Sequence, residues 1–303
     1  MICNHGFKTC LACLTLFSLA GCLFFPNTQS DLIGKLVMVS DMTGHSEITL
    51  FDLRTLEFTR ITDNRFIEYD PEWMPNGTQI IFSSDTVDLN GHFSPKLFLA
   101  NIQNGVVTEV KTNPAITGQP DPSPDGNYIL ISGTNFSADV DIFTFDLDNN
   151  EYVNVSNSLG DDQYPDWSPD GKQIAFSSNR NGNWDIYTIN KDGSNLEQIT
   201  TAAGNNIEPK WSSDGKQIVF SSDRSGSWEI YTMLIGGTMI DQITFSGSNN
   251  SQPTWSPDSG MIAFVSETTS GYHDLYIYVL ASGQLINMTP GPNYDYQSPS
   301  WIK

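Results

Sequence analysis

Basic side chains are scarce in this chain of 303 residues, which contains 14 lysines and arginines against 35 aspartates and glutamates. A formal net charge of −21 argues against nucleic-acid binding, because such binding depends on basic contacts to phosphate. It also argues against a polybasic patch that would hold the chain to anionic lipid. Cysteine is equally rare: only Cys3, Cys10, Cys13 and Cys22 occur, so the sequence after residue 22 contains no disulfide.

Long apolar runs are absent, and the longest candidate extends only from residue 9 to residue 20. Such a run is too short for a stable membrane-spanning helix, but it has the length of a signal-peptide core. It ends in Leu19-Ala20-Gly21-Cys22, which resembles a bacterial lipobox. This resemblance implies cleavage before Cys22 and acylation of that residue.

We therefore expect residues 1–21 to be a lipoprotein signal peptide, and residues 22–34 to be a lipidated cysteine with a short tether. The alternative is an ordinary secretory cleavage site in which Cys22 occurs by chance. The predicted location is the bacterial cell envelope, with membrane anchoring through the lipid. In a host with an outer membrane, Leu23 after the cysteine favours the outer membrane and periplasm, because Asp commonly marks inner-membrane retention at this position.

Signatures of enzymatic chemistry are also missing. The chain has no G-x-S-x-G nucleophile elbow, no H-E-x-x-H zinc motif and no glycine-rich phosphate loop. Residues 146–150 are a fragment of an EF-hand pattern, which we interpret as an acidic turn. No catalytic residue, metal or cofactor is therefore assigned, and the chain is not predicted to be an enzyme.

One sequence unit recurs along most of the chain. Two clear copies read Pro165-Asp166-Trp167-Ser168-Pro169-Asp170-Gly171 and Pro209-Lys210-Trp211-Ser212-Ser213-Asp214-Gly215. The first prolines of successive units lie at positions 71, 120, 165, 209, 253 and 299, which are 44 to 49 residues apart. This period is typical of a four-stranded propeller blade.

Each unit divides into four short strands, expected in one copy at residues 165–168, 173–177, 185–189 and 196–200. Pro169 presets the backbone of the turn between the first two strands, and Gly171 supplies the positive φ at its end. Pro165 is expected at the first position of its strand, where no hydrogen-bond donor is lost. No stretch after the signal peptide has a helical period, so the chain is predicted to be all-β.

The two ends of the chain complement each other. Residues 36–40, 47–53 and 57–62 match the second, third and fourth strands of a unit, and residues 299–303 supply its missing first strand. Pairing of these ends would close the ring and remove exposed strand edges. We therefore predict a six-bladed β-propeller of four-stranded antiparallel blades over residues 35–303. The blades are expected at 35–62 with 298–303, and at about 71–110, 120–155, 165–200, 209–244 and 253–289.

The repeated Pro-x-Trp-Ser-Pro-Asp-Gly pattern, followed by Ile-Ala-Phe-Ser-Ser and an Ile-Tyr pair, resembles the repeat of TolB-type β-propellers. The clearest copies are residues 165–200 and 209–244, and the resemblance extends from about residue 35 to the end. It implies the propeller fold, and similar repeats occur in propellers attached to prolyl-oligopeptidase-like enzymes. TolB carries a separate N-terminal α/β domain, whereas here only the predicted tether precedes the first blade.

Residues that recur in most units are interpreted as parts of the scaffold. The tryptophans of the repeat are expected to pack between blades; they are Trp73, Trp167, Trp211, Trp255 and Trp301. The acids before the third strand are expected to bind turn backbone or the arginines Arg180 and Arg224. These acids are Glu47, Asp141, Asp185, Glu229 and Asp274.

The segments between units vary, and in a propeller they converge on one face around the mouth of the central channel. They carry acids, amides and aromatics, which suit either a protein partner or a sugar. The candidate binding residues are Glu68, Tyr69, Asp70, Gln119, Asp162, Tyr164, Glu208, Asn250, Gln252, Tyr294 and Tyr296.

Two functions are compatible with this pattern. The first is a lipid-anchored scaffold that presents a rigid acidic propeller to an envelope protein with a basic face. The alternative is a carbohydrate-binding or carbohydrate-active propeller with a site at the channel mouth. Glycosidic chemistry there would need two carboxylates about 5–9.5 Å apart, taken from Glu68, Asp70, Asp162 and Glu208. The missing catalytic motifs favour the first function.

Overall fold

The computed structural model describes residue 32 and residues 34–87, 93–112, 115–134, 139–201, 204–236, 239–291 and 294–302. The predicted signal peptide, Cys22 and most of the tether lie outside these described residues. Every helix or strand assigned within them is a β-strand, numbered β1 to β24. These described residues contain no helix that is long and apolar enough to cross a membrane.

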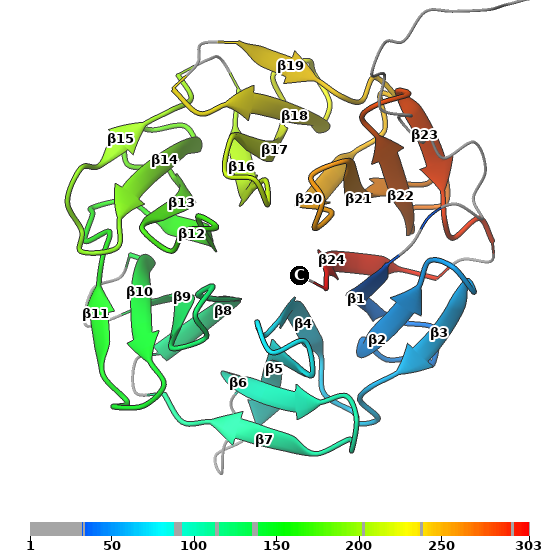
Figure 1. Ribbon diagram of the computed structural model, residues 1–303, viewed down its shortest axis with the longest axis horizontal. Helices are drawn as coiled ribbons and strands as arrows, with labels where there is room; N and C mark the ends of the chain where they lie inside the picture. The colour runs from blue at the N-terminus through cyan, green and yellow to red at the C-terminus, as the bar shows by residue number, and fades with distance from the viewer. Residues whose placement is uncertain are drawn as a thin grey trace, which may run out of the picture.

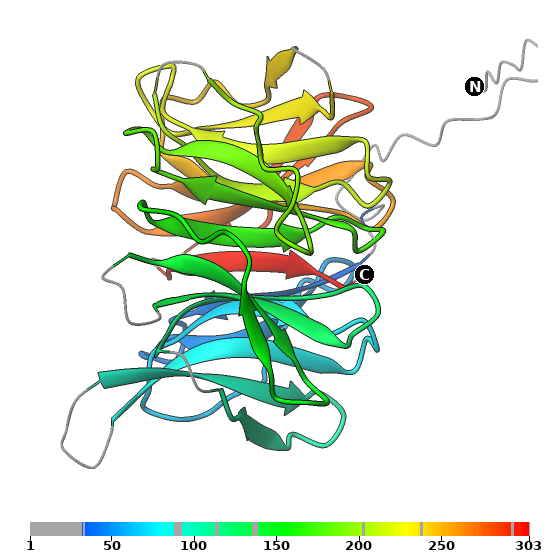
Figure 2. The same ribbon diagram turned by 90° about the vertical axis from the view of Figure 1, so that its left-hand side faces the viewer.

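The strands form six four-stranded antiparallel sheets that are arranged as blades around a central axis (Figure 1). Seen from the side, the blades build a disk-like body (Figure 2). The predicted six-bladed all-β propeller is therefore confirmed.

The blades are numbered in chain order, and the strands of each blade are given from the innermost, at the channel, to the outermost. Blade 1 contains β24 (Tyr296–Trp301), β1 (Lys35–Ser40), β2 (Glu47–Asp52) and β3 (Glu57–Arg60). Blade 2 contains β4 (Glu68–Trp73), β5 (Gln79–Val87), β6 (Phe93–Asn101) and β7 (Val107–Val110). Blade 3 contains β8 (Ala115–Pro122), β9 (Tyr128–Thr134), β10 (Asp141–Asp146) and β11 (Tyr152–Asn154).

The other three blades repeat this order. Blade 4 contains β12 (Asp162–Trp167), β13 (Gln173–Ser178), β14 (Asp185–Asn190) and β15 (Glu197–Gln198). Blade 5 contains β16 (Asn206–Trp211), β17 (Gln217–Ser222), β18 (Glu229–Leu234) and β19 (Ile240–Gln242). Blade 6 contains β20 (Asn250–Trp255), β21 (Met261–Glu267), β22 (His273–Val279) and β23 (Gln284–Asn287).

Blade 1 is shared between the two ends of the chain. Strand β24 pairs antiparallel with β1, with Trp301 opposite Leu36 and Ser300 opposite Val37 (red beside blue in Figure 1). Trp301 is only 2% exposed and packs in a cluster with Leu36 and Phe51. The predicted closure of the ring by its terminal strands is confirmed, and it gives both terminal strands a partner.

The prolines of the repeat do not begin their strands, which corrects the sequence prediction. Pro165 is the fourth residue of β12, and the strand register shifts at this point: Gln163 faces Ser177, whereas Asp166 faces Ala175. Three steps along β12 therefore match two steps along β13, which is a β-bulge. The bulge accommodates the missing proline N–H inside the strand, so each innermost strand extends toward the connecting loop.

The hydrophobic core is divided among the interfaces between blades. Trp211 packs with Phe220 of its own blade and with Ala175 and Ile186 of blade 4. Trp167 likewise packs with Leu130 of blade 3. The repeat tryptophans thus pack between blades, as predicted, and each blade is stable only beside its neighbours.

The acids before the third strand join neighbouring blades through hydrogen bonds. Asp185 accepts hydrogen bonds from Oγ1 of Thr200 at 2.7 Å and from Nδ2 of Asn206, at the start of blade 5, at 2.9 Å. Glu229 accepts one from Nδ2 of Asn250, at the start of blade 6, at 2.6 Å. These carboxylates satisfy buried donors at the blade junctions, in keeping with a structural role.

The partners of the two arginines differ from the sequence prediction. Arg180 forms an ion pair with Asp162 at 3.0 Å, and Arg224 donates a hydrogen bond to Oδ1 of Asn206. Each arginine therefore reaches the first residue of the innermost strand in its own blade. The reason is that this residue and the arginine loop lie at the same end of the paired strands.

If the terminal pairing stabilises the whole ring, Trp301→Ala should lower the free energy of unfolding by about 3–5 kcal/mol, because it leaves a cavity beside Leu36 and Phe51. Chemical denaturation followed by circular dichroism measures this change. The matched control is Leu159→Ala, whose side chain is 96% exposed and should matter by less than about 0.5 kcal/mol. Equal effects of the two substitutions would contradict the importance of this contact.

Candidate functional site

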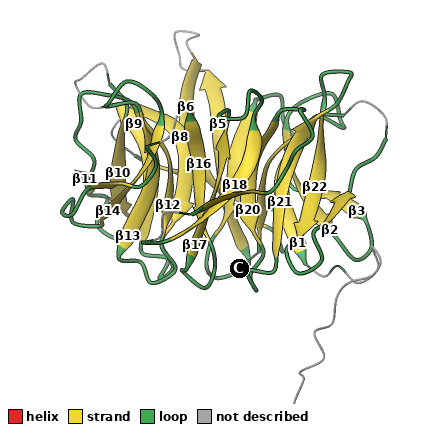
Figure 3. Cartoon of the chain, turned by 90° about the horizontal axis from the view of Figure 1, so that it is seen from above, coloured by secondary structure: helices red, strands yellow, loops and turns green. Residues whose placement is uncertain are grey.

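The candidate site is the mouth of the central channel. The innermost strands start on the face that carries the connections between blades and run toward the opposite face, where the chain ends at β24 (Figure 3). The residue before the repeat proline points to the channel in all six blades. These residues, Asp70, Gln119, Tyr164, Glu208, Gln252 and Ser298, line one pocket with a volume of about 70 Å³.

All six of these residues have a positive φ, which is uncommon for residues other than glycine. The angles are 51° for Asp70, 59° for Gln119, 56° for Tyr164, 59° for Glu208, 55° for Gln252 and 48° for Ser298. This conformation belongs to the bulge at the proline, so every blade turns one side chain toward the axis. Such a conformation costs free energy and needs support from its surroundings.

Hydrogen bonds from one blade to the next supply part of that support. The backbone N–H of Gln119 donates to Oδ2 of Asp70 at 3.2 Å, and that of Tyr164 donates to Oε1 of Gln119 at 2.8 Å. The N–H of Gln252 donates to Oε2 of Glu208 at 2.6 Å. Side chains at the channel mouth therefore hold the backbone of the following blade.

The same chain of contacts continues across the closure of the ring. The N–H of Ser298 donates to Oε1 of Gln252 at 2.8 Å, and its Oγ donates to Oδ1 of Asp70 at 3.2 Å. Glu208 differs in its acceptor, because its N–H donates to Oγ of Ser177, in β13 of blade 4, at 3.1 Å. Tyr164 occupies the preceding position, and its ring carries no acceptor at the distance that an amide or carboxylate oxygen reaches.

A second layer of channel side chains lies two residues further along each strand. These residues are Glu72, Asp121, Asp166, Lys210, Thr254 and Ser300. Nζ of Lys210 lies 2.5 Å from Oε1 of Glu72 and 3.3 Å from Oδ1 of Asp166. Blades 2 and 5 face each other across the ring, so the contact between Lys210 and Glu72 spans the channel.

The ion pair separates the mouth from a wider space below. Both Glu72 and Lys210 line the 70 Å³ pocket, and both also line a second pocket of about 350 Å³. Repeat tryptophans, including Trp73 and Trp211, surround this lower space. The channel mouth is thus a small depression, lined by the repeat prolines and the residues before them, whose floor is the Lys210–Glu72 pair.

Burial disfavours the ionised forms of the two acids at the mouth, Asp70 and Glu208. Desolvation raises the pKa of Asp70 and of Glu208 above the ordinary values, and their mutual repulsion adds to this effect at Glu208. Desolvation also raises the pKa of Tyr164. Burial alone would lower the pKa of Lys210, but the carboxylates of Glu72, Asp166 and Asp121 outweigh it and raise that pKa well above the usual range.

Several candidate residues from the sequence lie elsewhere. Glu68, Asp162 and Asn250 are buried at the starts of their strands, with exposures of 2%, 0% and 1%. Tyr69 is half-buried and donates from its hydroxyl to Oδ1 of Asp85 at 3.0 Å. Tyr296 is buried in the blade 1 cluster, and Tyr294 packs against the same cluster. The structure therefore brings five of the candidates to the channel: Asp70, Gln119, Tyr164, Glu208 and Gln252.

Apart from the repeat prolines, three residues that line the mouth pocket were not among the candidates from the sequence, namely Glu72, Lys210 and Ser298. The repeat itself contained a signal for the first two. Alternate residues of a strand share a face, and the position after the proline holds a lysine only in blade 5. Within the described residues, no group of three or more His, Cys, Asp or Glu side chains is placed to hold a metal ion.

The repeat indicated a relationship to TolB-type propellers, and comparison with known protein families confirms it. The family model described as TolB beta propeller domain matches residues 18–163, 86–202 and 137–303, in overlapping segments. The chain belongs to the TolB β-propeller family.

Individual relatives of this TolB-type propeller agree with that assignment. A TolB homologue from Chlorobium luteolum is 29% identical over 149 residues, which are 49% of this chain and 32% of that protein. The match therefore spans about a third of the length of that curated relative.

Solved TolB structures share the fold of this chain. TolB from Acinetobacter baumannii superposes with a TM-score of 0.78 at 21% identity, covering 89% of this chain and 66% of that chain. A structure described as putative TolB from Agrobacterium tumefaciens gives a TM-score of 0.72 at 19% identity, with coverages of 89% and 99%.

Substitution of the channel lysine should destabilise the protein. Lys210→Met leaves the carboxylates of Glu72 and Asp166 without their cation, and we expect a loss of about 3 kcal/mol in unfolding free energy. Lys216→Met is the matched control, because its pair with Asp214 is exposed and should contribute less than about 1 kcal/mol. Chemical denaturation of both variants provides the comparison. A Lys210→Met protein as stable as wild type would show that the Lys210–Glu72 ion pair does not stabilise the propeller.

Substitution of Glu208 should have an effect that depends on pH. Because folding raises the pKa of Glu208, its ionised form costs stability above that pKa, and this cost is absent at lower pH. Glu208→Gln places at this position the side chain that blades 3 and 6 already use, and it keeps the acceptor for the N–H of Gln252. The variant should be more stable than wild type at pH 7–8, and the difference should shrink toward pH 4. Thermal melts across this range test it; a uniform loss of stability at every pH would speak against burial as the cause.

Proposed function

We propose that this TolB-family propeller is a lipid-anchored binding protein of the bacterial cell envelope. Its rigid disk would present the connection-bearing face to a protein partner that has a basic surface. The family relationship and the predicted lipobox ending at Cys22 support the location. The net charge of −21 supports a basic partner, because opposite charge accelerates encounter and disfavours acidic proteins.

The channel mouth is the observation on which this proposal mainly depends. Its pocket of about 70 Å³ is much smaller than the roughly 300–1,000 Å³ of typical small-molecule sites. A sugar ring would find little room above the Lys210–Glu72 floor, whereas a single side chain from a docked protein fits there. The mouth therefore favours a protein-binding face over the carbohydrate-active alternative.

The anchor can be tested by fractionating cells that express the full chain. Cys22→Ala should move the protein from the membrane fraction to the soluble fraction, because the acyl chains then have no attachment site. Cys13→Ala, within the predicted signal peptide, should leave the protein at the membrane. Membrane association of Cys22→Ala equal to that of wild type would argue against acylation.

The partner can be tested by site-specific photo-crosslinking in the intact envelope. A photoreactive amino acid replaces Leu159, which is 96% exposed on the connection-bearing face, and a control carries it at Val106 beside the outer strand β7. We expect a discrete crosslinked protein from position 159 and not from position 106. The yield should fall as salt is raised, because exposed charge pairs are screened. Identical products at both positions, or a yield independent of salt, would contradict the proposal.

A further inference from the structure

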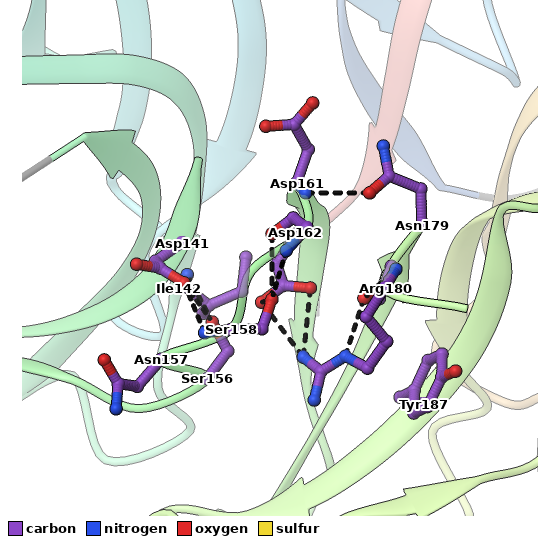
Figure 4. A network of polar contacts seen from close by, with 12 residues as sticks. Asp141, Ile142, Ser156, Asn157, Ser158, Asp161, Asp162, Asn179, Arg180 and Tyr187 are labelled. Carbon is purple, nitrogen blue, oxygen red and sulfur yellow. Dashed lines mark hydrogen bonds and ion pairs between the residues drawn. The ribbon is translucent and has the colours of Figure 1, made fainter. Parts of the chain in front are cut away.

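Blades 4 and 5 each contain a built-in site for a guanidinium group. In blade 4 the guanidinium of Arg180 donates from Nη2 to both carboxylate oxygens of Asp162 at 3.0 Å, and from Nε to Oγ of Ser178 at 2.8 Å (Figure 4). The same group lies over the rings of Phe176 and Tyr187, with Cζ at 5.4 and 4.9 Å from their centroids. Acceptors and aromatic faces thus hold the cation together.

Blade 5 repeats this arrangement with an amide in place of the carboxylate. Arg224 donates from Nε to Oγ of Ser222 at 3.0 Å and from Nη2 to Oδ1 of Asn206. Its Cζ lies 5.3 and 4.8 Å from the ring centroids of Phe220 and Tyr231. An asparagine at the start of the innermost strand is therefore sufficient to accept a guanidinium in this fold.

Blade 6 has the surroundings of this site but not the arginine. Phe264 and Tyr276 are stacked with centroids 5.9 Å apart, as are Phe176 and Tyr187 in blade 4. Ser266 lies opposite Asp274 in the neighbouring strand, as Ser178 lies opposite Asp185, and Asn250 begins the innermost strand as Asn206 does. The residue two positions after this serine, however, is Thr268 instead of arginine.

A pocket opens at the position that the arginine fills in the other two blades. It has a volume of about 580 Å³, and its lining includes Asn250, Phe264, Ser266, Thr268 and Tyr276. All four elements of the guanidinium site therefore face one space.

The polar atoms of this pocket are arranged to accept a donor. Asn250 donates from Nδ2 to Oε2 of Glu229 at 2.6 Å, as Asn206 donates to Asp185 at 2.9 Å. In the described part of the chain, Oδ1 of Asn250 has no hydrogen-bond donor, whereas Oδ1 of Asn206 accepts Arg224. The buried carboxylate of Glu229 behind the amide and the pocket residue Glu267 give this space negative surroundings.

Blade 2 shows that a missing arginine alone does not make such a site. It has an aromatic pair, Phe82 and Phe98, and its strand starts with Glu68. Both carboxylate oxygens of Glu68 are already used, Oε2 by the N–H of Ile48 and by Thr62, and Oε1 by Nδ2 of Asn64. The combination of acceptors, aromatic pair and open pocket points to blade 6.

We infer that the pocket of blade 6 binds the guanidinium of an arginine from the protein partner, in the same way that blades 4 and 5 bind their own. This inference rests on the proposed binding of a protein with a basic face and names one contact of that face. At the connection-bearing face the pocket is lined by Asn250, Ser266 and Thr268, and it extends along the blade to Gly283 near the opposite face. Phe245, which also lines the pocket, is 76% exposed. An apolar side chain next to the incoming arginine would contact Phe245.

Arginine fits this pocket better than lysine. The planar guanidinium can lie over the Phe264 and Tyr276 rings while its separate N–H groups reach Oγ of Ser266 and Oδ1 of Asn250. An ammonium group is a compact charge that does not reproduce both contacts at once.

The direct test is titration of the purified propeller with the peptide acetyl-Phe-Arg-Gly-amide, followed by NMR. Versions of the peptide with lysine or with neutral citrulline in place of arginine separate charge from shape. We expect binding of the arginine peptide, and binding weaker by about tenfold or more for citrulline. Equal affinity for the three peptides, or no binding of any, would overturn the inference.

Two variants of the protein locate the binding in blade 6. Thr268→Arg supplies the guanidinium from within the chain and should weaken peptide binding by about tenfold or more. Ser225→Arg adds the same charge to the exposed equivalent loop of blade 5 and should leave the affinity unchanged. If both variants weaken binding equally, the effect is one of charge alone, and the assignment to this pocket fails.

A third variant gains a site and does not depend on the stability of the first two. Arg224→Thr recreates in blade 5 the combination found in blade 6, so the number of arginine peptides bound per propeller should rise from one to two. An unchanged stoichiometry in a folded protein would contradict the inference.

If crosslinking in the envelope persists in Thr268→Arg, the binding function stands and only the arginine contact is wrong. If the peptide binds but no envelope protein is crosslinked, the proposed function is wrong instead.

Discussion

The pairing of β24 with β1 is the constraint on which the rest of the molecule depends. Each blade buries its hydrophobic faces against the blades on both sides. In an open ring, the blade at each end would therefore leave one hydrophobic face exposed. Without β24, blade 1 would lack its innermost strand, and the channel would lose Ser298 and Ser300. Closure therefore supplies channel residues as well as stability, because the last strand carries the sixth member of both channel layers.

Closure also explains how six strained residues can be maintained around the channel. Each positive φ before a proline is supported by hydrogen bonds that come from a neighbouring blade or strand. The carboxylate of Asp70 in blade 2 and the hydroxyl of Ser298 in blade 1 meet only because the ring is complete. Strain at one blade is thus offset by contacts supplied by the next.

The fold could be predicted from the sequence to a large extent. Four strands per unit, six units and the shared first blade follow from the spacing of Pro71, Pro120 and their successors, because repeated units must stack to bury their core. The β-bulge at each proline could not be predicted, since Pro165 is compatible with a strand start and with a bulge. Only the paired strand shows which of the two occurs.

The candidate site was predicted less completely. Asp70, Gln119 and Glu208 reach the channel. Glu68 and Asp162 lie only two residues before the residue that precedes a repeat proline, yet they are buried at blade junctions. The bulge decides this difference, because it changes which side chains face the axis. Lys210 was missed since its partner Glu72 is 138 residues away in the chain and becomes a neighbour only across the closed ring.

Differences between blades are the most informative features for function. Contacts present in every blade hold the scaffold, whereas Lys210 occurs at its position only in blade 5, and Thr268 stands in blade 6 where blades 4 and 5 carry an arginine. One closes the channel with an ion pair, and the other leaves a pocket in place of an internal arginine.

Both features depend on the closed ring, and native-state hydrogen exchange of the β1 and β24 amides tests that closure most directly. We predict that these amides exchange as slowly as those of β13 and β17, through global unfolding alone. Rapid exchange in β1 and β24 while β13 and β17 stay protected would contradict closure of the ring by its terminal strands.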